Sequence, residues 1–311
     1  MGNLNCNSKI NRIIKWFLEE HRELVSGNRI NSWAETLGIQ LNEQGVLSEK
    51  GLFELFVLAT LWNNPPTYNT EKGAQVFESI KNQYTLTNFK QAETNTTLKN
   101  ELKKIATSTI GNQGIFDLLN YLTNETIWNK IKQILNSPKI GEQEADIERL
   151  SNLYGLFNPR RYSGGAFLTV KVFLIFRELR IQFRNIEKYQ YHPAICCIPD
   201  SHVRNALKEL GLISDDRIDV KSLISYSQIV AEHFCTGTYE LYDLPLFFVH
   251  KENCLNKIIA AGSCASTSEK DAGYCPSCGS PLIWRQARLT GEFYKGCTNF
   301  RGGCRWHNRS Y

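Results

Sequence analysis

Residues 198–204 read IPDSHVR, and they lie between a two-cysteine run and the stretch NALKELGLI. Apolar residues in that second stretch recur three and four positions apart, which predicts a helix that begins at Asp200 or Ser201. Aspartate is a favoured N-cap because its carboxylate accepts hydrogen bonds from the free amides of the first helical turn. A carboxylate beside a hydroxyl and an imidazole is also a set of groups that catalysis uses. Asp200 therefore has two interpretations, a helix cap and a catalytic carboxylate.

The cap interpretation explains only part of this stretch. A full capping box has Glu or Gln three residues after the cap, but Val203 and Arg204 occupy the positions concerned. Capping by itself also has no need of Pro199 or His202. These surplus groups are the reason to look for a catalytic context in the rest of the chain.

The overall composition is that of a globular chain. Of the 311 residues, 42% are hydrophobic and 22% are charged, which is enough for one large core or two moderate ones. The longest apolar runs, residues 52–62 and 167–176, are interrupted by Glu54 and Lys171 and fall short of the roughly 18 residues of a spanning helix. The first residues, MGNLNCNSKI, lack the apolar stretch of a secretory signal. We expect a soluble cytoplasmic protein with no membrane partner.

The pattern up to about residue 260 is helical. Apolar residues recur at helical spacing over 115–122 and again over 127–135. The polar stretch GSCASTSEKDAG, residues 262–273, has the composition of a flexible linker. We therefore expect a mainly α fold, with a helical domain over 1–261, a linker over 262–273 and a small module over 274–311.

The cysteines are concentrated near the C-terminal end. A disulfide framework is typical of small secreted chains, whereas a local cluster in a cytoplasmic protein indicates a metal site first. The four cysteines outside this cluster, Cys6, Cys196, Cys197 and Cys235, are predicted to be buried thiols. Six of the ten lie in the last 60 residues, namely Cys254, Cys264, Cys275, Cys278, Cys297 and Cys304.

Four cysteines of the terminal module have the spacing of a zinc site. A C-x2-C pair, Cys275 and Cys278, is followed 18 residues later by a C-x6-C pair, Cys297 and Cys304. The first pair forms a tight knuckle, and an intervening hairpin returns the second pair to complete a tetrahedron of four thiolates. Such a closed site is structural, since metal binding supplies the folding free energy that so small a segment lacks. Thiols without a metal are the alternative, and His307 is a spare ligand.

The same module is basic and aromatic. From Gly273 onward six Lys/Arg face one acid, Glu292, although the net charge of the whole chain is only +5. Cations interleaved with rings suit a nucleic acid, because the cations neutralise phosphates while the rings stack on bases. A solvated basic surface is the alternative. The cations are Arg285, Arg288, Lys295, Arg301, Arg305 and Arg309, and they lie among Trp284, Phe293, Tyr294, Phe300 and Trp306.

The motif C-P-x-C-G at residues 275–279, followed by GEFYKGC and NFRGGC, resembles the zinc ribbons at the C-termini of type IA topoisomerases. Those ribbons bind DNA. The resemblance covers residues 275–306 and implies an accessory DNA-binding module with a structural Zn²⁺. It implies nothing about catalysis, because nothing upstream resembles a topoisomerase.

The D-S-H-V stretch at residues 200–203, after Ile-Pro and before a helix, resembles the catalytic aspartate region of the helix-hairpin-helix DNA glycosylase superfamily. The order of segments is also similar over residues 48–215. The resemblance implies a helical core of two subdomains in which Asp200 opens a helix and is catalytic. It also implies that LFELFVLATLWNN, from Leu52, is an early helix whose end supplies Asn64 to fill the gap left by an extruded base.

The segment YSGGAFLTVKVFLIFREL, residues 162–179, lies where this family has its hairpin. By the resemblance, Gly164 and Gly165 form the turn where backbone amides approach a phosphate, although the usual L-P-G-V-G-x-K-T-A hairpin is absent. The 29 positions from Lys171 to Asp200 resemble the spacing in the archaeal 8-oxoguanine glycosylases, where a lysine of this region attacks the sugar.

Other interpretations of these residues stay open. Thr169 can be aligned at the place of the lysine, and Lys171 can simply snorkel out of an apolar helix or pair with Glu178. Two rings, Trp62 and Tyr68, are candidates for stacking on the flipped base, with core packing as their alternative. His202 is a candidate for holding the Asp200 carboxylate or touching a phosphate, with a structural histidine as its alternative.

Together these features predict a DNA N-glycosylase that flips a modified base out of double-stranded DNA, excises it and leaves an abasic site. An oxidised purine follows from the archaeal resemblance, and a bulky phage-modified base is the other substrate class, because bacterial anti-phage DNA glycosylases exist with such architectures. The enzyme would act in base-excision repair or anti-phage defence at the nucleoid of a bacterial or archaeal cell. No obligate protein partner is expected.

Cofactors and rival functions complete the expectation. The iron-sulfur loop of endonuclease III relatives, C-x6-C-x2-C-x5-C, is missing, so we expect no iron-sulfur cluster. A structural Zn²⁺ outside the catalytic centre is the one metal that we expect. The rival is a non-enzymatic DNA-binding protein in which Asp200 only caps its helix and the ribbon supplies affinity. A nuclease is disfavoured because no clustered acidic motif of the two-metal kind is present.

Overall fold

The computed structural model describes residues 2–26, 29–39, 42–43, 46–61, 70–111, 113–157, 170–236, 240–260, 275, 282–286, 293–297 and 307–308 of the chain. Within these ranges the protein is mainly helical, as the spacing of its apolar residues predicts. The helices up to the middle of the chain are α1 (Gly2–Glu20), α2 (Trp33–Thr36), α3 (Glu49–Leu61), α4 (Thr70–Ile80), α5 (Leu86–Ala92), α6 (Thr96–Ile105), α7 (Gln113–Leu122), α8 (Glu125–Leu135) and α9 (Gln143–Leu156). They are followed by α10 (Val172–Gln182), α11 (Ser201–Glu209), α12 (Val220–Phe234), α13 (Leu244–Lys251) and α14 (Leu255–Ala260).

Short elements connect these helices. The tighter or wider helical turns are η1 (Arg22–Leu24), η2 (Ala106–Ile110), η4 (Glu187–Tyr189) and η5 (Pro193–Ile195). Two antiparallel pairs of two-residue strands, β1 (Val25–Ser26) with β2 (Arg29–Ile30) and β3 (Asn42–Glu43) with β4 (Val46–Leu47), interrupt the N-terminal part. The sequence pattern did not indicate these ribbons, because two residues are too few to show an alternation. Near the C-terminal end, β5 (Leu282–Gln286), β6 (Phe293–Cys297) and β7 (His307–Asn308) form an antiparallel sheet in the order β5-β6-β7.

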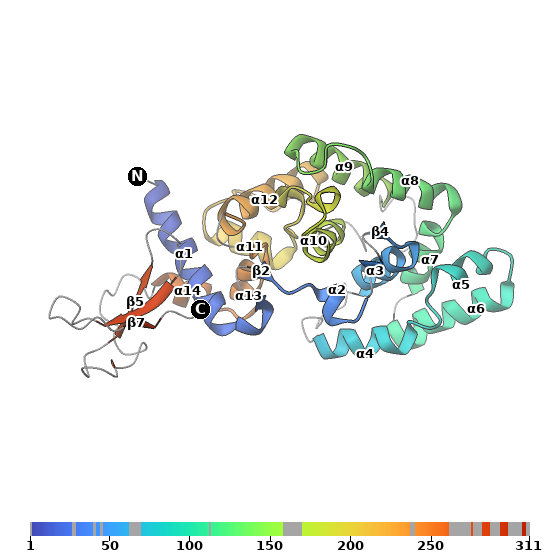
Figure 1. Cartoon of the computed structure of the whole chain (residues 1–311), viewed down its shortest axis with the longest axis horizontal. Coiled ribbons are helices and arrows are strands. Elements are labelled where there is room, and N and C mark those ends of the chain that lie inside the picture. Colours follow the sequence, from blue (N-terminus) through green and yellow to red (C-terminus); the bar gives the residue numbers. More distant parts are fainter. Residues whose placement is uncertain are drawn as a thin grey trace.

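One half of the helical part is built around α3, with α4, α5 and α7 against it (Figure 1). Ten α3 residues between Gly51 and Leu61 are buried, so this helix is enclosed on nearly all sides and forms the centre of its half. The Phe53 ring lies 5.5 Å from Phe89 and 6.2 Å from Trp128 between ring centroids. Aromatic pairs at such distances add to the free energy of burial, and they join helices that are far apart in sequence.

The other half contains α1 and α11–α14. Here α11 packs against α13, α12 packs against η5, and α1 packs against both α13 and α14, as Figure 1 shows for this half. Phe17 of α1 and Phe248 of α13 are 5.9 Å apart between ring centroids. The N-terminal helix is therefore part of the same core as the helices that close the helical part of the chain.

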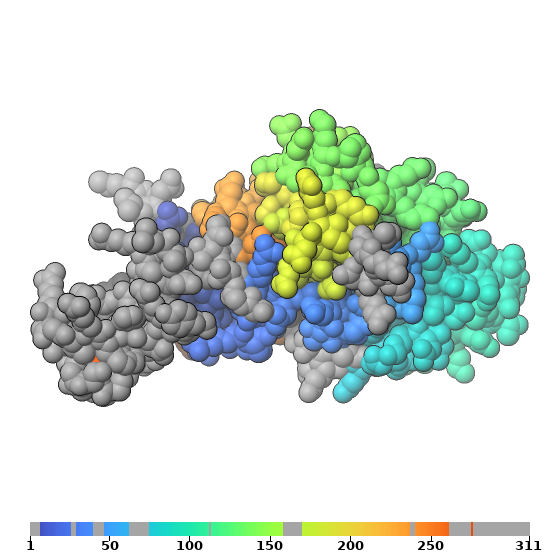
Figure 2. Space-filling model, viewed as in Figure 1, coloured from blue at the N-terminus to red at the C-terminus, as the bar shows by residue number. Residues whose placement is uncertain are grey.

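Helix α10 lies between the two halves (Figure 1). It contacts α2 and α3 on one side and α9 and η5 on the other. Every residue from Val172 to Leu179 is buried, including the charged Arg177 and Glu178. Figure 2 shows the yellow segment that follows α10 at the centre of the visible face, between the blue N-terminal part and the green α8–α9 region.

The predicted buried thiols are confirmed in two cases. Cys196 and Cys197 are fully buried. The prediction is wrong for Cys235, which is half-buried because it forms the C-cap of α12, where the helix reaches the surface. The side chain of Cys6 lies outside the described part of the chain.

No helix in the ranges described above combines the length and the apolar character that a bilayer crossing requires.

Candidate active site

Asp200 caps the helix that the sequence predicts. It is the N-cap of α11, and its Oδ1 accepts a hydrogen bond of 2.9 Å from the amide of Val203. The first turn closes as usual, since the Arg204 amide donates to the Asp200 carbonyl at 2.9 Å. The predicted cap is therefore confirmed. The capping box is incomplete, as expected, because the position that would hold Glu or Gln carries Val203.

The environment of this cap differs from that of a surface helix end. Asp200 keeps part of its surface accessible, yet the surrounding groups remove enough water to raise the pKa of its carboxyl to about 6. Burial is the main cause, and the charge of Asp243 adds to it. Hydrogen bonds from the amides of Val203 and His202 and the charge of Arg204 act in the opposite direction. A carboxyl with such a pKa changes its protonation state close to neutral pH.

Lys171 immediately precedes α10, and its side chain is almost completely enclosed. The residue is 4% exposed, and its Nζ has no hydrogen-bond partner within the described residues. Burial lowers the pKa of the amine to about 6, against the opposing charge of Asp200. An amine with this pKa is mostly neutral at pH 7 and so has a free electron pair, as a nucleophile requires.

The structure shows neither of the two structural alternatives for Lys171, which are an exposed amine at the surface and an ion pair with Glu178. The side chain does not snorkel to the surface, because only 4% of it is exposed. It does not pair with Glu178 either. Glu178 Oε2 instead accepts hydrogen bonds from Ser32 Oγ at 2.9 Å and from the Ala34 amide at 3.0 Å, so it fixes the start of α2. The expectation of a lysine inside the helix is also wrong, since α10 begins one residue later.

A buried aspartate holds the segment that carries Asp200. Asp243, at the start of α13, is 1% exposed, and its Oδ1 accepts from the Ile198 amide at 2.8 Å and from Arg177 Nη1 at 2.9 Å. Arg177 belongs to α10, the helix that Lys171 precedes. One carboxylate thus joins α10, α13 and the backbone two residues before Asp200, which fixes the two candidate groups relative to each other.

A second contact fixes the same segment from the other side. Arg204 Nη1 donates to the carbonyl of Pro199 at 2.8 Å, and its Nε forms an ion pair with Asp216. The residue immediately before Asp200 is therefore held by the helix that Asp200 caps. The contacts of Arg204 and the capping hydrogen bond of Asp200 together fix the backbone at the start of α11.

His202 does not contact the Asp200 carboxylate with its ring. Its Nδ1 lies 3.0 Å from Nδ1 of His250, and its ring packs edge-on against Phe247 with 5.0 Å between centroids. Burial lowers the pKa of His202, and the charge of Lys251 adds to this effect. The structural alternative therefore describes the observed contacts of the His202 ring, while its contact with a phosphate stays a prediction.

Several predicted residues lie outside the part of the chain that is described. These are Trp62, Asn64, Tyr68, Gly164, Gly165, Thr169, Cys278, Arg288, Arg301, Cys304 and Arg305. Of the other predicted DNA contacts, Arg285 lies on β5 opposite Tyr294, and Lys295 lies on β6 opposite Trp284. Only the backbone of these strands is described, so their roles stay predictions.

The terminal sheet contains one of the predicted zinc ligands. The register pairs Cys297, the last residue of β6, with Leu282, the first residue of β5. Cys278 precedes Leu282 by four residues, and Cys304 precedes His307, which pairs with Gly296, by three. Of the four cysteines, Cys275 and Cys297 lie within the described residues and Cys278 and Cys304 do not, so the common zinc site stays a prediction. Zinc there would bind four thiolates and serve the fold alone.

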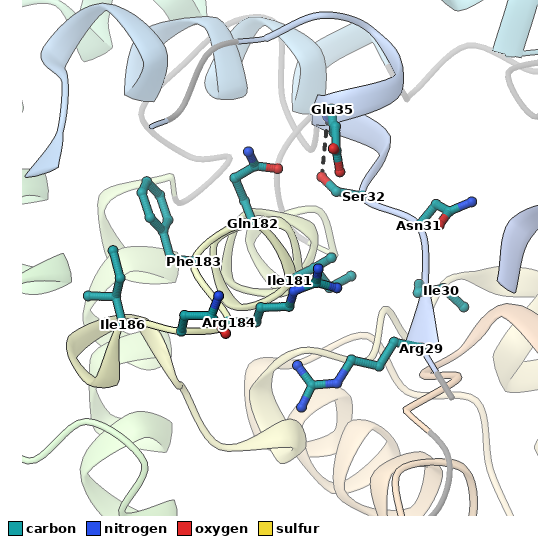
Figure 3. Close-up of a pocket in the computed structure, with 11 residues that line it drawn as sticks. Arg29, Ile30, Asn31, Ser32, Glu35, Ile181, Gln182, Phe183, Arg184 and Ile186 are labelled. Atoms are coloured by element: carbon teal, nitrogen blue, oxygen red, sulfur yellow. Dashed lines mark hydrogen bonds between the residues drawn. The ribbon is translucent and has the colours of Figure 1, made fainter. Parts of the chain in front are cut away.

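A separate pocket lies at the far end of α10 (Figure 3). It is bounded by β2, the start of α2 and the residues that end α10, and the Glu35 amide donates to Ser32 Oγ at 3.3 Å on its wall. Lys171 precedes the first turn of this 11-residue helix, so about 16 Å of helix separates it from the pocket. The pocket is lined by residues that include Arg29, Asn31, Gln182 and Arg184. This pocket is therefore distinct from the site around Asp200.

Two residues of the site were not among the sequence-based candidates. Asp243 had a local signal, because Asp-Leu-Pro is typical of a helix start with proline in the first turn. Nothing in the sequence links it to Arg177, which is 66 positions away. Such a bridge depends on how α10 and α13 pack, and only the folded chain shows it.

Comparison with family models, curated proteins and solved structures finds no match for this chain.

Proposed function

We propose that this protein is a DNA N-glycosylase with a helix-hairpin-helix type of core and a C-terminal zinc ribbon. One observation carries the proposal: the buried amine of Lys171, which has no hydrogen-bond partner among the described residues, lies in the electrostatic field of a helix-capping carboxylate, Asp200. Burying a lysine costs free energy, because the amine loses either its hydration or its proton, so we expect a buried lysine where the neutral form has a use. Perturbed groups of this kind concentrate at functional sites, and the resemblance of D-S-H-V to the glycosylase family names the reaction.

The carboxylate of Asp200 has a defined task in this reaction. As the bond from sugar to base breaks, positive charge develops on the sugar, and a carboxylate held nearby stabilises it. The amides at the start of α11 and the Asp243 bridge would keep the carboxylate in place for this purpose. Where water completes the reaction, ionised Asp200 also accepts the proton of that water.

Lys171 adds a second route. A neutral Nζ would attack the anomeric carbon of the sugar while the base leaves with the bonding electrons, and loss of the ammonium proton would then permit a Schiff base with the opened sugar. Hydrolysis of the Schiff base returns the lysine, and strand cleavage can precede that step. Because the pKa of Lys171 is about 6, the amine needs no separate base to be neutral at pH 7.

The substrate class follows from the resemblance. A base inside the duplex is inaccessible, so the nucleotide must first be flipped at a cost of a few kcal/mol. An oxidised purine or a bulky phage-modified base is the proposed target, with Asn64 filling the gap and the zinc ribbon adding affinity for the DNA backbone. A role in repair follows from the first target, and a role in anti-phage defence follows from the second.

One observation favours a rival. The Asp200 carboxylate already has a complete structural task, because it accepts the capping hydrogen bond from Val203. The rival function is a DNA-binding protein without catalysis. This rival function does not explain why Lys171 is buried.

The test is release of free base. The full-length protein is incubated with duplexes that carry single oxidised, alkylated or deaminated bases and with genomic DNA of phages with glucosylated bases, and free base is identified by mass spectrometry. Borohydride is added in parallel to reduce any Schiff base between protein and DNA. Release of one base class supports the proposal, and trapping that is lost in Lys171→Gln assigns the lysine. Tight binding without release on any substrate would favour the rival.

A further inference from the structure

Three thiols are collected close to the candidate site. Cys196 and Cys197 follow η5, and Cys235 ends α12, a helix that packs against η5. The Sγ atoms of Cys197 and Cys235 are 3.9 Å apart, which is van der Waals contact. A disulfide has its sulfurs about 2.05 Å apart, so closure needs a movement of nearly 2 Å shared between two side chains. The thiols do not form a group of metal-ligand geometry within the described residues.

The two thiols of the contacting pair differ in access. Cys197 is fully buried, and burial raises the pKa of its thiol well above 9. Cys235 is half-buried at the end of its helix and is the more exposed of the two residues, so we expect a small oxidant to react with it first. A half-buried cysteine in contact with a fully buried one suits a thiol that is oxidised first and a resolving thiol, because the raised pKa of Cys197 disfavours its own reaction with peroxide.

Neither cysteine lies in the interior of a regular helix. Cys197 is between η5 and α11, in a segment without regular structure, and Cys235 is a C-cap rather than a residue of the helix interior. Each side chain can rotate without breaking a ladder of helical hydrogen bonds. The contacts of Cys197 Sγ, with the Pro193 carbonyl at 3.6 Å and with Cys235, are both weak sulfur contacts.

We propose that Cys197 and Cys235 are an oxidation site that closes to an intramolecular disulfide with a peroxide as oxidant. Cys235 sulfur attacks one peroxide oxygen, the O–O bond breaks, and a water molecule leaves with the proton of the thiol. Cys197 sulfur then attacks the resulting sulfenic acid, the S–O bond breaks, and the hydroxyl leaves as a second water with the Cys197 proton. Two thiols and one hydrogen peroxide thus give one disulfide and two waters.

The bond would tie the end of α12 to the residue that directly precedes Ile198. The Ile198 amide is held by Asp243, and Asp200 follows two residues later. Pulling Cys197 toward α12 therefore acts on the segment that positions the Asp200 carboxylate. The consequence that oxidation slows base excision rests on the proposed function, whereas formation of the bond does not.

The pair can be tested by peptide mapping of the full-length protein. The native protein is exposed to stoichiometric hydrogen peroxide, thiols are blocked with N-ethylmaleimide before denaturation, and tryptic peptides are identified without reduction. We expect a cross-linked peptide that joins residues 189–204 to residues 222–251. Because 189–204 contains both Cys196 and Cys197, the decisive sample is the Cys196→Ala variant, in which the cross-link must persist.

Controls separate this bond from general oxidation. Cys197→Ala and Cys235→Ala should each abolish the cross-linked peptide, and the half-buried Cys254, in peptide 252–257, should remain reduced at the same peroxide dose. Closure of the loop should raise the Tm of the oxidised protein by roughly 5 °C relative to the reduced protein. Sulfinic acid at Cys235 without a cross-link, or a cross-link that is lost in Cys196→Ala, would overturn the proposal.

Excision is measured separately on the same samples. A cross-linked protein with unchanged excision would remove the functional consequence and leave the oxidation site standing. Absence of excision in the reduced protein would count against the glycosylase proposal alone.

Discussion

The charge of Asp200 acts on the buried amine of Lys171 and partly offsets the desolvation that lowers the pKa of that amine. The two residues come from the starts of α11 and α10, and both have a pKa of about 6. Groups with similar pKa values that act on each other titrate as a pair, so the apparent values belong to the pair. The site should therefore take up its two protons in two macroscopic steps around pH 6.

The first prediction concerns the pH dependence of base excision. Ionised Asp200 is needed for either route and neutral Lys171 for the amine route, so the rate should fall as the pH drops below about 6. If both groups must be deprotonated, the logarithm of kcat/KM should approach a slope of two against pH. Lys171→Gln should reduce any remaining activity to a slope of one. A flat profile between pH 5 and 8 would contradict the assignment of both groups.

The second prediction concerns stability. A lysine whose pKa is lowered on folding binds its proton less well in the folded state, so the unfolded state takes up more protons below pH 10.5. Lys171 thus costs stability most fully below about pH 6, and the cost disappears as the pH rises toward 10.5. Lys171→Met should raise the free energy of unfolding at pH 6 by on the order of a few kcal/mol.

Urea unfolding at pH 6, 8 and 10 measures this difference. The gain of Lys171→Met should shrink steadily across that series. Lys208→Met, at an exposed position of α11, is the matched control and should show no such trend. A destabilised Lys171→Met at pH 6 would mean that the amine has a favourable partner and is not a desolvated group.

The third prediction concerns the Asp243 bridge. Removing one partner of a buried ion pair leaves an uncompensated charge and typically costs about 3–5 kcal/mol. Asp243→Ala should therefore destabilise the protein by this amount and should also free the Ile198 amide, which then exchanges its proton faster with solvent. Replacing both partners, with Arg177→Met and Asp243→Leu together, should recover part of the stability.

The two readouts of this experiment answer different questions. Stability recovered in the double variant with fast exchange at Ile198 shows that the bridge positions the Asp200 segment. Slow exchange at Ile198 in Asp243→Ala would show that other contacts hold this backbone, and the positioning role would fail.

Local features of the site could be predicted from the sequence, and long-range ones could not. The N-cap at Asp200 and the helix after it follow from one residue type before a helical pattern, and both are present. The pattern did not fix where α10 begins, because apolar residues lie on both sides of Lys171. The burial of Lys171 and the partner of Glu178 depend on tertiary packing, which the spacing of residue types along the sequence does not predict.

The fourth prediction concerns zinc. Elemental analysis of the purified protein should find about one zinc per chain, because Cys275, Cys278, Cys297 and Cys304 would form one closed site. Cys297→Ser should lose the metal and weaken DNA binding, with little change in helical circular dichroism, since the helices have their own core. Cys254→Ser is the control and should keep the zinc. Zinc retained in Cys297→Ser would exclude the four-thiolate site.

The most direct measurement of the central claim compares two N-cap variants. Asp200→Asn and Asp219→Asn each replace a capping aspartate with an equally good capping residue, at the start of α11 and α12 respectively. Each is assayed with wild type for alkali-revealed strand cleavage on duplexes and phage genomes with oxidised, alkylated, deaminated and glucosylated bases. The account predicts abasic sites on one substrate class with wild type and Asp219→Asn, and none with a folded, DNA-binding Asp200→Asn. Abasic sites made equally well by Asp200→Asn would contradict it, because Asp200 would then be a helix cap and nothing more.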